Sequence, residues 1–180
     1  MGKQFDQLSD AHIAFIEAQP IYFTGSAARD GKVNVSPKGM DSLRVFSPNE
    51  IAYVNVTGSG NETAGHLLDT PRLTLMWCSF DRRPQILRTY GTARAIHPYD
   101  ADWQTWAPKL PDFLAARQII VQTIEMVQTS CGYAVPLMTL DGERDTLRKW
   151  ADDKGDAGVK QYWEDRNQTT LDGAPTGILE

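Results

Sequence analysis

The chain has 180 residues, 41% of them hydrophobic, and a net charge of −5 at neutral pH, which describes one ordinary globular domain with a substantial core. A chain with this net negative charge is not expected to have a broad positive surface that would bind nucleic acid or anionic lipid. No apolar run approaches the roughly 20 residues that span a bilayer, and the first 17 residues predict an amphipathic helix rather than a signal peptide. We therefore expect a cytoplasmic protein without nucleic-acid or membrane partners.

Cysteine and histidine are few. Cys78 and Cys131 are far apart, and we expect two reduced, mostly buried thiols. The three histidines, His12, His66 and His97, are too scattered for a metal signature, so no metal site is expected.

The first strands follow the predicted N-terminal helix. Residues 21–28 predict a strand, Asp30-Gly31 predicts a hairpin turn, and residues 33–36 predict the returning strand. Pro37 lacks a backbone donor, so this strand either ends there or runs along an edge of the sheet. Residues 43–46 predict a short third strand.

Residues 51–72 are the stretch around which the chain is organised. Residues 51–56 predict a buried strand, residues 57–60 a glycine-bearing turn, and residues 61–69 a short helix. Such a helix start presents unpaired backbone N–H groups at the positive end of the helix dipole, an arrangement that binds phosphate.

Side chains in this stretch support the same interpretation and also allow a plainer one. Ser59, Asn61 and Thr63 add donors near the helix start. Ser59 and Glu62 have the spacing of a capping box, which by itself indicates only a capped surface helix that binds nothing.

The second half of the chain continues the strands and then changes character. Residues 73–78 predict a strand buried on both faces, and residues 85–97 alternate cleanly, with Arg88 and Arg94 on one face. Further expected elements are a helical insertion at 98–114, strands at 118–127 and 132–140, helices at 143–150 and 157–166, and a flexible tail at 172–177. Six or seven short strands with few helices between them predict a closed or half-open β-barrel.

Three segments, in this order and spacing, resemble the pyridoxamine 5'-phosphate oxidase-like family, the FMN-binding split barrels. They are VNVSPKG at 33–39, GSGNETAGHL at 58–67 and LRTYGTAR at 87–94. Segments after residue 127 look like one uncharacterised branch of that family. The resemblance implies a mostly β (α+β) fold: a six-stranded split β-barrel at residues 1–140, with flanking helices and a helical C-terminal extension at 141–180 packed on the same domain. It also implies a homodimer with FMN at each of two sites across the subunit interface.

The resemblance further implies a set of cofactor-binding residues. Asn34, Ser36 and Lys38 occupy alternate positions, so they would share one strand face, and a polar stripe there suits a phosphate. Arg88 is favoured for the phosphate because of its fork-shaped donor set, whereas Arg94 is expected to be structural. The complete set is Asn34, Ser36, Lys38, Ser59, Gly60, Asn61, Thr63 and Arg88.

One departure from the family pattern bears on the substrate. Pyridoxamine 5'-phosphate oxidases proper carry an arginine–lysine pair at the helix start, where this chain has Gly60-Asn61-Glu62-Thr63. The tail at 166–180 also lacks the histidine of the oxidase's substrate segment. We therefore expect a flavin-dependent oxidoreductase that acts on another small molecule, with no catalytic residue assigned.

Several alternatives stay open at the level of sequence. A haem-binding or haem-degrading split barrel would need a histidine ligand, for which His66 is the one attractive candidate. A deazaflavin-dependent reductase and a non-catalytic flavin-binding protein fit the same phosphate site. Tyr53, Trp77 and Tyr133 could wall a ring cavity, although aromatic residues in strands are more often part of the core.

Overall fold

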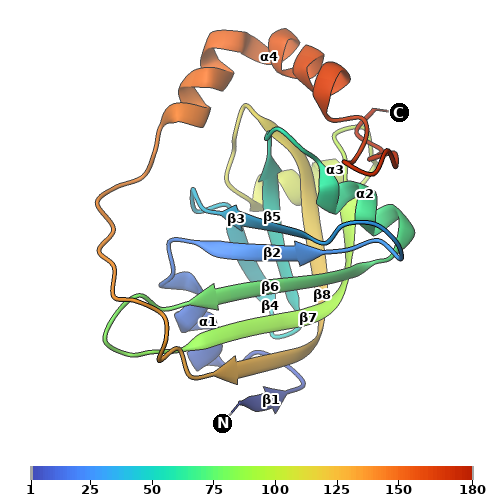
Figure 1. The fold of residues 1–180 in the computed structure, drawn as a ribbon. Helices are drawn as coiled ribbons and strands as arrows, with labels where there is room; N and C mark the ends of the chain where they lie inside the picture. Colours follow the sequence, from blue (N-terminus) through green and yellow to red (C-terminus); the bar gives the residue numbers. More distant parts are fainter. Residues whose placement is uncertain (1, 180) are drawn as a thin grey trace.

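The computed structural model describes residues 2–179 and consists mainly of antiparallel strands (Figure 1). The strands are β1 (Lys3–Phe5), β2 (Tyr22–Ser26), β3 (Asn34–Lys38), β4 (Leu43–Ser47), β5 (Glu50–Val56), β6 (Arg72–Cys78), β7 (Ile86–Ile96) and β8 (Ala116–Ser130). The helices are α1 (Asp10–Glu17), α2 (Glu62–Asp69), the short α3 (Trp103–Trp106) with the 3₁₀ turn η1 (Ala107–Lys109), and α4 (Thr146–Arg166).

All the strands belong to one sheet, in the order β3-β2-β6-β7-β8-β5-β4, with β1 added to β8. Strand β8 is 15 residues long and joins the two halves of the sheet, because one of its edges pairs with β7 and the other with β5 and β1. The expected α+β split barrel is confirmed. Among residues 2–179 the sheet has eight strands rather than six.

The interior of the barrel explains why these sequences form strands. Tyr53, Leu75, Trp77, Leu87 and Ile120 are each at most 1% exposed and belong to one core cluster. Burying a side chain of this size contributes about 2 kcal/mol. Tyr53 and Trp77 are therefore core residues, as is more common for aromatic residues in strands.

The N-terminal prediction was partly wrong. Lys3–Phe5 forms β1, and helix α1 begins only at Asp10, where the Ser9 hydroxyl accepts from the His12 N–H. Strand β1 pairs with the far end of β8, a contact that local periodicity cannot reveal.

Two of the C-terminal predictions needed correction and one was confirmed. Residues 132–140 form no strand and are mostly exposed, in keeping with the missing donor of Pro136. The two expected helices are the two helical segments of α4, which the non-helical Gly155 separates, although the first begins at Thr146 rather than at residue 143. The tail at 172–177 is not free, since Thr176 is completely buried and its hydroxyl donates to the Asn167 carbonyl.

Both cysteines are free, but only Cys78 is buried; Cys131 is exposed, contrary to expectation. Within residues 2–179, no helix combines the length and the apolar character needed to cross a membrane.

Candidate functional site

A polar cavity of about 670 Å³ lies between β3, the turn after β5 and the start of α2. The structure brings seven of the eight predicted site residues to its wall, and the exception is Arg88. The predicted members are Asn34, Ser36, Lys38, Ser59, Gly60, Asn61 and Thr63, and the wall also contains Asn55, Glu62, Arg117 and Leu171.

Strand β3 supplies its polar stripe by simple alternation. Asn34, Ser36 and Lys38 are half-buried, whereas Val33 and Val35 are exposed. Pro37 does not interrupt this alternation because β3 is an edge strand that pairs only with β2.

The Lys38 ammonium is enclosed among polar groups without a negative partner. Its Nζ donates to the Asn55 Oδ1 at 2.8 Å, and the Asn55 amide donates in turn to the Gln118 Oε1 at 2.8 Å. Burial, together with the smaller effect of the positive charge of Arg117, lowers the pKa of Lys38 to about 8. Lys38 therefore loses its proton more readily than a surface lysine does.

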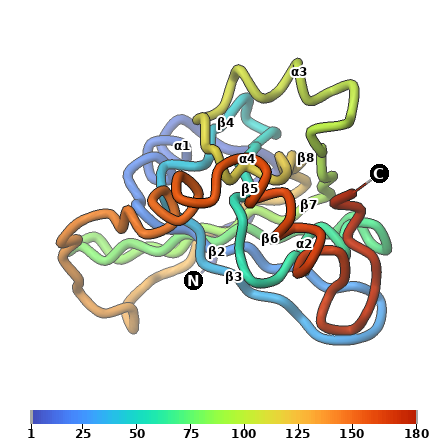
Figure 2. The backbone as a smooth tube through the Cα atoms, turned by 90° about the horizontal axis from the view of Figure 1, so that it is seen from above, coloured from blue at the N-terminus to red at the C-terminus, as the bar shows by residue number. Residues whose placement is uncertain are grey.

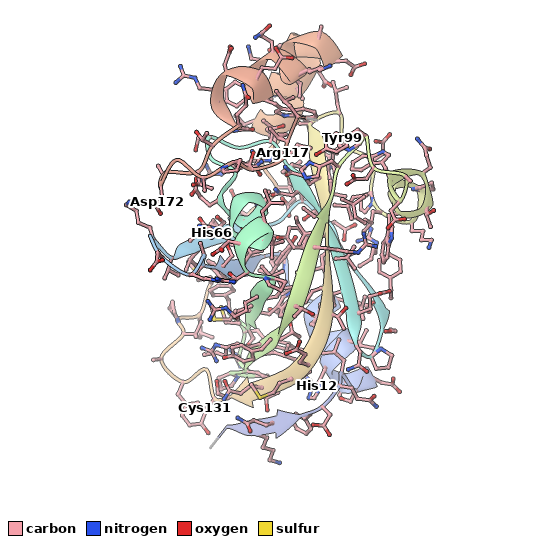
Figure 3. The ribbon with its side chains drawn as sticks, turned by 90° about the vertical axis from the view of Figure 1, so that its right-hand side faces the viewer. His12, His66, Tyr99, Arg117, Cys131 and Asp172 are labelled. Atoms are coloured by element: carbon pink, nitrogen blue, oxygen red, sulfur yellow. The ribbon has the colours of Figure 1, made fainter. Side chains whose placement is uncertain are left out.

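Arg117, at the start of β8, is a second cation in the same cavity, and sequence reasoning missed it. It is 3% exposed and lies at the end of the barrel nearest α4 (Figure 3). One guanidinium nitrogen donates to the Asn167 Oδ1 at 2.6 Å, and the Nε has no partner. Burial lowers the pKa of Arg117 to about 10. The only sequence signal was a charged residue directly before the predicted strand at 118–127.

No carboxylate oxygen within residues 2–179 makes an ion pair with either Lys38 or Arg117. Buried charges of one sign are unfavourable unless an opposite charge joins them. The cavity is thus chemically matched to an anionic ligand.

The start of α2 adds an unpaired acceptor to this cavity. Its N-cap, Asn61, makes no side-chain capping bond, and its Oδ1 is buried without a partner. The predicted capping box is wrong, because the Glu62 carboxylate accepts from the Leu171 N–H of the tail instead. Glu62 is thereby tied to the tail, and Asn61 Oδ1 can accept from a ligand hydroxyl.

Thr63 is oriented by a buried chain of hydrogen bonds. Its hydroxyl oxygen accepts from the Ser26 hydroxyl at 3.2 Å and from the Asn34 amide at 3.3 Å. Both lone pairs are then occupied, which leaves the Thr63 O–H to donate to a ligand in the cavity. The Ser26 oxygen also contacts the His66 Nδ1 at 3.0 Å.

Other sequence candidates lie elsewhere. Arg88 donates to the Ser130 hydroxyl on β8, outside the cavity wall, so its role in cofactor binding stays a prediction. Arg94 pairs with Asp102 at 2.9 Å, as expected for a structural arginine. His66 lies on α2 (Figure 3), is 3% exposed and is not part of the cavity wall. Tyr133 is 82% exposed.

A second, larger cavity of about 940 Å³ adjoins the first. The two share part of their walls, at 37–40 and 57–59. Helix α4 covers this end of the barrel, as Figure 2 shows from above. Most side chains that complete the wall are apolar or aromatic: Ala18, Pro20, Ile21, Phe80, Met138, Leu140, Leu147, Trp150 and Tyr162. An anion site next to an apolar cavity suits a ligand with a phosphate end and a ring end.

Known proteins show the same architecture. Residues 8–131 match the family model described as pyridoxamine 5'-phosphate oxidase. A curated relative, the pyridoxamine 5'-phosphate oxidase family protein ustO of Aspergillus flavus, is 36% identical over 189 residues, which cover 95% of this chain and 76% of the relative.

Two solved structures share the fold at low identity. A candidate pyridoxamine 5'-phosphate oxidase of Lactobacillus delbrueckii is 19% identical with a TM-score of 0.54, over 68% of this chain and 94% of its own. HupZ of Group A Streptococcus is 16% identical with a TM-score of 0.51, over 66% of this chain and 91% of its own.

Proposed function

This chain belongs to the pyridoxamine 5'-phosphate oxidase family, and from that premise we propose that it is an FMN-binding oxidoreductase acting on a small organic molecule. The observation that carries the proposal is the pair of cations, half-buried Lys38 and buried Arg117, in one cavity without a carboxylate partner in the described part of the chain. A phosphate group would supply the missing negative charge.

Arg117 also accounts for the departure from the family pattern. Where pyridoxamine 5'-phosphate oxidases proper have an arginine–lysine pair, this chain has Gly60-Asn61. We propose that Arg117, reaching the cavity from β8, and Lys38, reaching it from β3, together take over the grip on the phosphate.

The polar groups beside the cations suit the ribityl chain of FMN. Asn61 Oδ1 offers an unpaired acceptor for a hydroxyl, and the Thr63 hydroxyl offers a donor. FMN, when bound, supplies the redox chemistry through its isoalloxazine ring, while the protein binds and orients it. The adjoining apolar cavity has the chemistry to surround such a ring.

We further propose a cytoplasmic homodimer. Val35, on the outer face of β3, and Val33, directly before this strand, are 65% and 73% exposed, behind the polar stripe that lines the cavity. Exposed apolar residues beside a site are suited to a partner subunit. The free thiols of Cys78 and Cys131 fit a reducing compartment.

The test is an absorption spectrum of the purified full-length protein, repeated after addition of FMN and after dithionite. We expect a two-banded flavin spectrum that bleaches on reduction. A Soret band would replace the proposal with a haem protein, and binding of a deazaflavin but not of FMN would change the cofactor. If none of these binds, the oxidoreductase proposal fails.

A further inference from the structure

Helix α4 carries an unusual backbone conformation at its centre. Gly155 has φ 62° and ψ 175°, a combination that is essentially restricted to glycine. A Cβ atom at this position would meet nothing within 4 Å. The backbone conformation of the bend, and not a lack of space, therefore requires glycine here.

The bend brings two aromatic rings together. Trp150 and Tyr162 are twelve residues apart, which in a straight helix separates them by about 18 Å along the axis. Across the bend their ring centroids are 5.1 Å apart, edge to face at 79°. Both residues line the larger cavity.

The rest of that cavity is also apolar, although part of it faces water. Ile21, Phe80 and Leu147 line it together with Met138 and Leu140, which are 63% and 60% exposed. Its charged lining side chains are two acids and two bases: Asp81, Glu143, Lys38 and Arg144. A wall of this kind favours neither an anion nor a cation.

We propose that this cavity binds the substrate beside the flavin ring, and that the substrate is a planar, uncharged ring compound held by Trp150 and Tyr162. The claim that this ligand is a substrate rests on the proposed function. A volume of about 940 Å³ is at the upper end of the roughly 300–1,000 Å³ of ordinary ligand pockets, so it leaves room for a second molecule beside a flavin ring. Aromatic side chains pack on other flat rings in offset-stacked or edge-to-face arrangements, and Trp150 and Tyr162 both line this cavity.

The test is calorimetric titration of the FMN-loaded, full-length protein with 2-naphthol, a flat and uncharged two-ring probe. We expect one site per chain. Trp150→Ala and Tyr162→Ala each weaken binding at least tenfold, and decahydro-2-naphthol, which has the same carbon skeleton without flat rings, binds at least tenfold more weakly than 2-naphthol.

The chain offers matched controls for the bend. Gly155→Ala cannot hold the φ of 62° without strain, so it should weaken 2-naphthol binding at least tenfold. Gly25→Ala makes the same change in β2, outside the wall of this cavity, where the new Cβ would be at an ordinary 3.7 Å from the Thr74 Cβ, and should change the affinity less than twofold. Trp106→Ala, on α3 and away from this cavity, is the control for loss of a tryptophan.

The affinity for FMN, measured by quenching of flavin fluorescence in the same variants, separates the two proposals. If FMN does not bind but 2-naphthol binds the flavin-free protein in a Trp150-dependent way, the proposed function fails and the ligand cavity stands. If FMN binds while 2-naphthol fails to bind, is excluded by FMN, or binds Trp150→Ala and Gly155→Ala as it binds the wild type, the substrate inference is overturned.

Discussion

Arg117 is buried in the polar cavity with its Nε unpaired and without a carboxylate partner in the described residues. Arg117→Met should lower the affinity for FMN about 100-fold, because a hydrogen bond to a charged group contributes about 1.5–3 kcal/mol. Arg94→Met, which breaks the exposed pair with Asp102, is the matched control and should leave the affinity unchanged. Flavin fluorescence titration measures both. An affinity of Arg117→Met within threefold of the wild type would remove this residue from the site.

Lys38 should make stability and FMN affinity respond to pH in opposite directions. Its pKa is about 8 in the folded, flavin-free protein and near 10.4 when unfolded. Between these values the unfolded chain binds more protons, so the free energy of unfolding should rise as pH increases from 8 to 9.5. A bound phosphate favours the charged ammonium, so the affinity for FMN should fall over the same range, by at most about tenfold per pH unit.

Lys38→Met isolates these two slopes from all other titrating groups. Urea unfolding of the flavin-free protein and FMN titration, each at pH 7.5, 8.5 and 9.5, should show both slopes reduced in the variant. Lys3→Met, an exposed lysine on β1, should keep them. Equal pH profiles for the wild type and Lys38→Met would show that Lys38 is not the titrating group.

Whether a cavity residue could be predicted from the sequence depends on how far along the chain its neighbours in the cavity lie. Asn34, Ser36 and Lys38 could be predicted together because strand alternation is a local property. Arg117 and Asn167 could not, since they meet the turn at Gly58 only through the curvature of the sheet and the path of α4. Long-range packing of this kind leaves no periodic signal in the sequence.

At the level of elements, the pairing of β7 with β8 contains a position where only glycine fits. The register shifts between Tyr90 and Gly91 because β8 carries one extra residue there. A Cβ atom on Gly91 would overlap the carbonyl oxygen of Thr123, which is backbone and cannot move aside.

Gly91→Ala should therefore destabilise the fold by about 3 kcal/mol, the upper end of overpacking costs. Gly25→Ala, in the middle of β2, is the control, because its new Cβ would be at an ordinary 3.7 Å from the Thr74 Cβ. Urea unfolding followed by circular dichroism compares the two. If Gly91→Ala unfolds at the same urea concentration as Gly25→Ala, the close approach at the bulge is not a constraint.

Elements that depend on local pattern were predictable, and those that depend on distant partners were not. The stretch from β5 to α2 agrees with expectation to within one residue, because the strand, turn and helix signals are all contained in it. Strand β1 and the ordered tail escaped prediction, since each contacts residues far along the chain: β1 pairs with β8, and in the tail Leu171 donates to Glu62 and Asp172 accepts from Lys32. The break at Gly155 lies between the two helices that the sequence predicted, at 143–150 and 157–166, although the bend itself was not predicted.

On the scale of the whole molecule, the polar cavity lies close to the surface at the edge strand β3. The inward face of β3 is polar and lines the cavity, while Val35 on its outward face and Val33 directly before the strand are exposed to solvent. Natural edge strands are normally protected by charge, by proline or by a covering element. The outward face of β3 is apolar and has Pro37 at its end. We therefore expect a second subunit to cover it.

Val35→Glu should consequently separate the proposed homodimer into monomers. Sedimentation of the wild type is expected to give twice the 20.1 kDa chain mass, and that of Val35→Glu a single chain mass. Because the cofactor site is proposed to span the interface, the variant should also bind FMN at least tenfold more weakly. Leu137→Glu, at a residue that is 70% exposed, adds the same charge away from β3 and should change neither property. A dimer that persists in Val35→Glu would place the interface elsewhere, and a monomeric variant with full FMN affinity would show that each chain holds its cofactor alone.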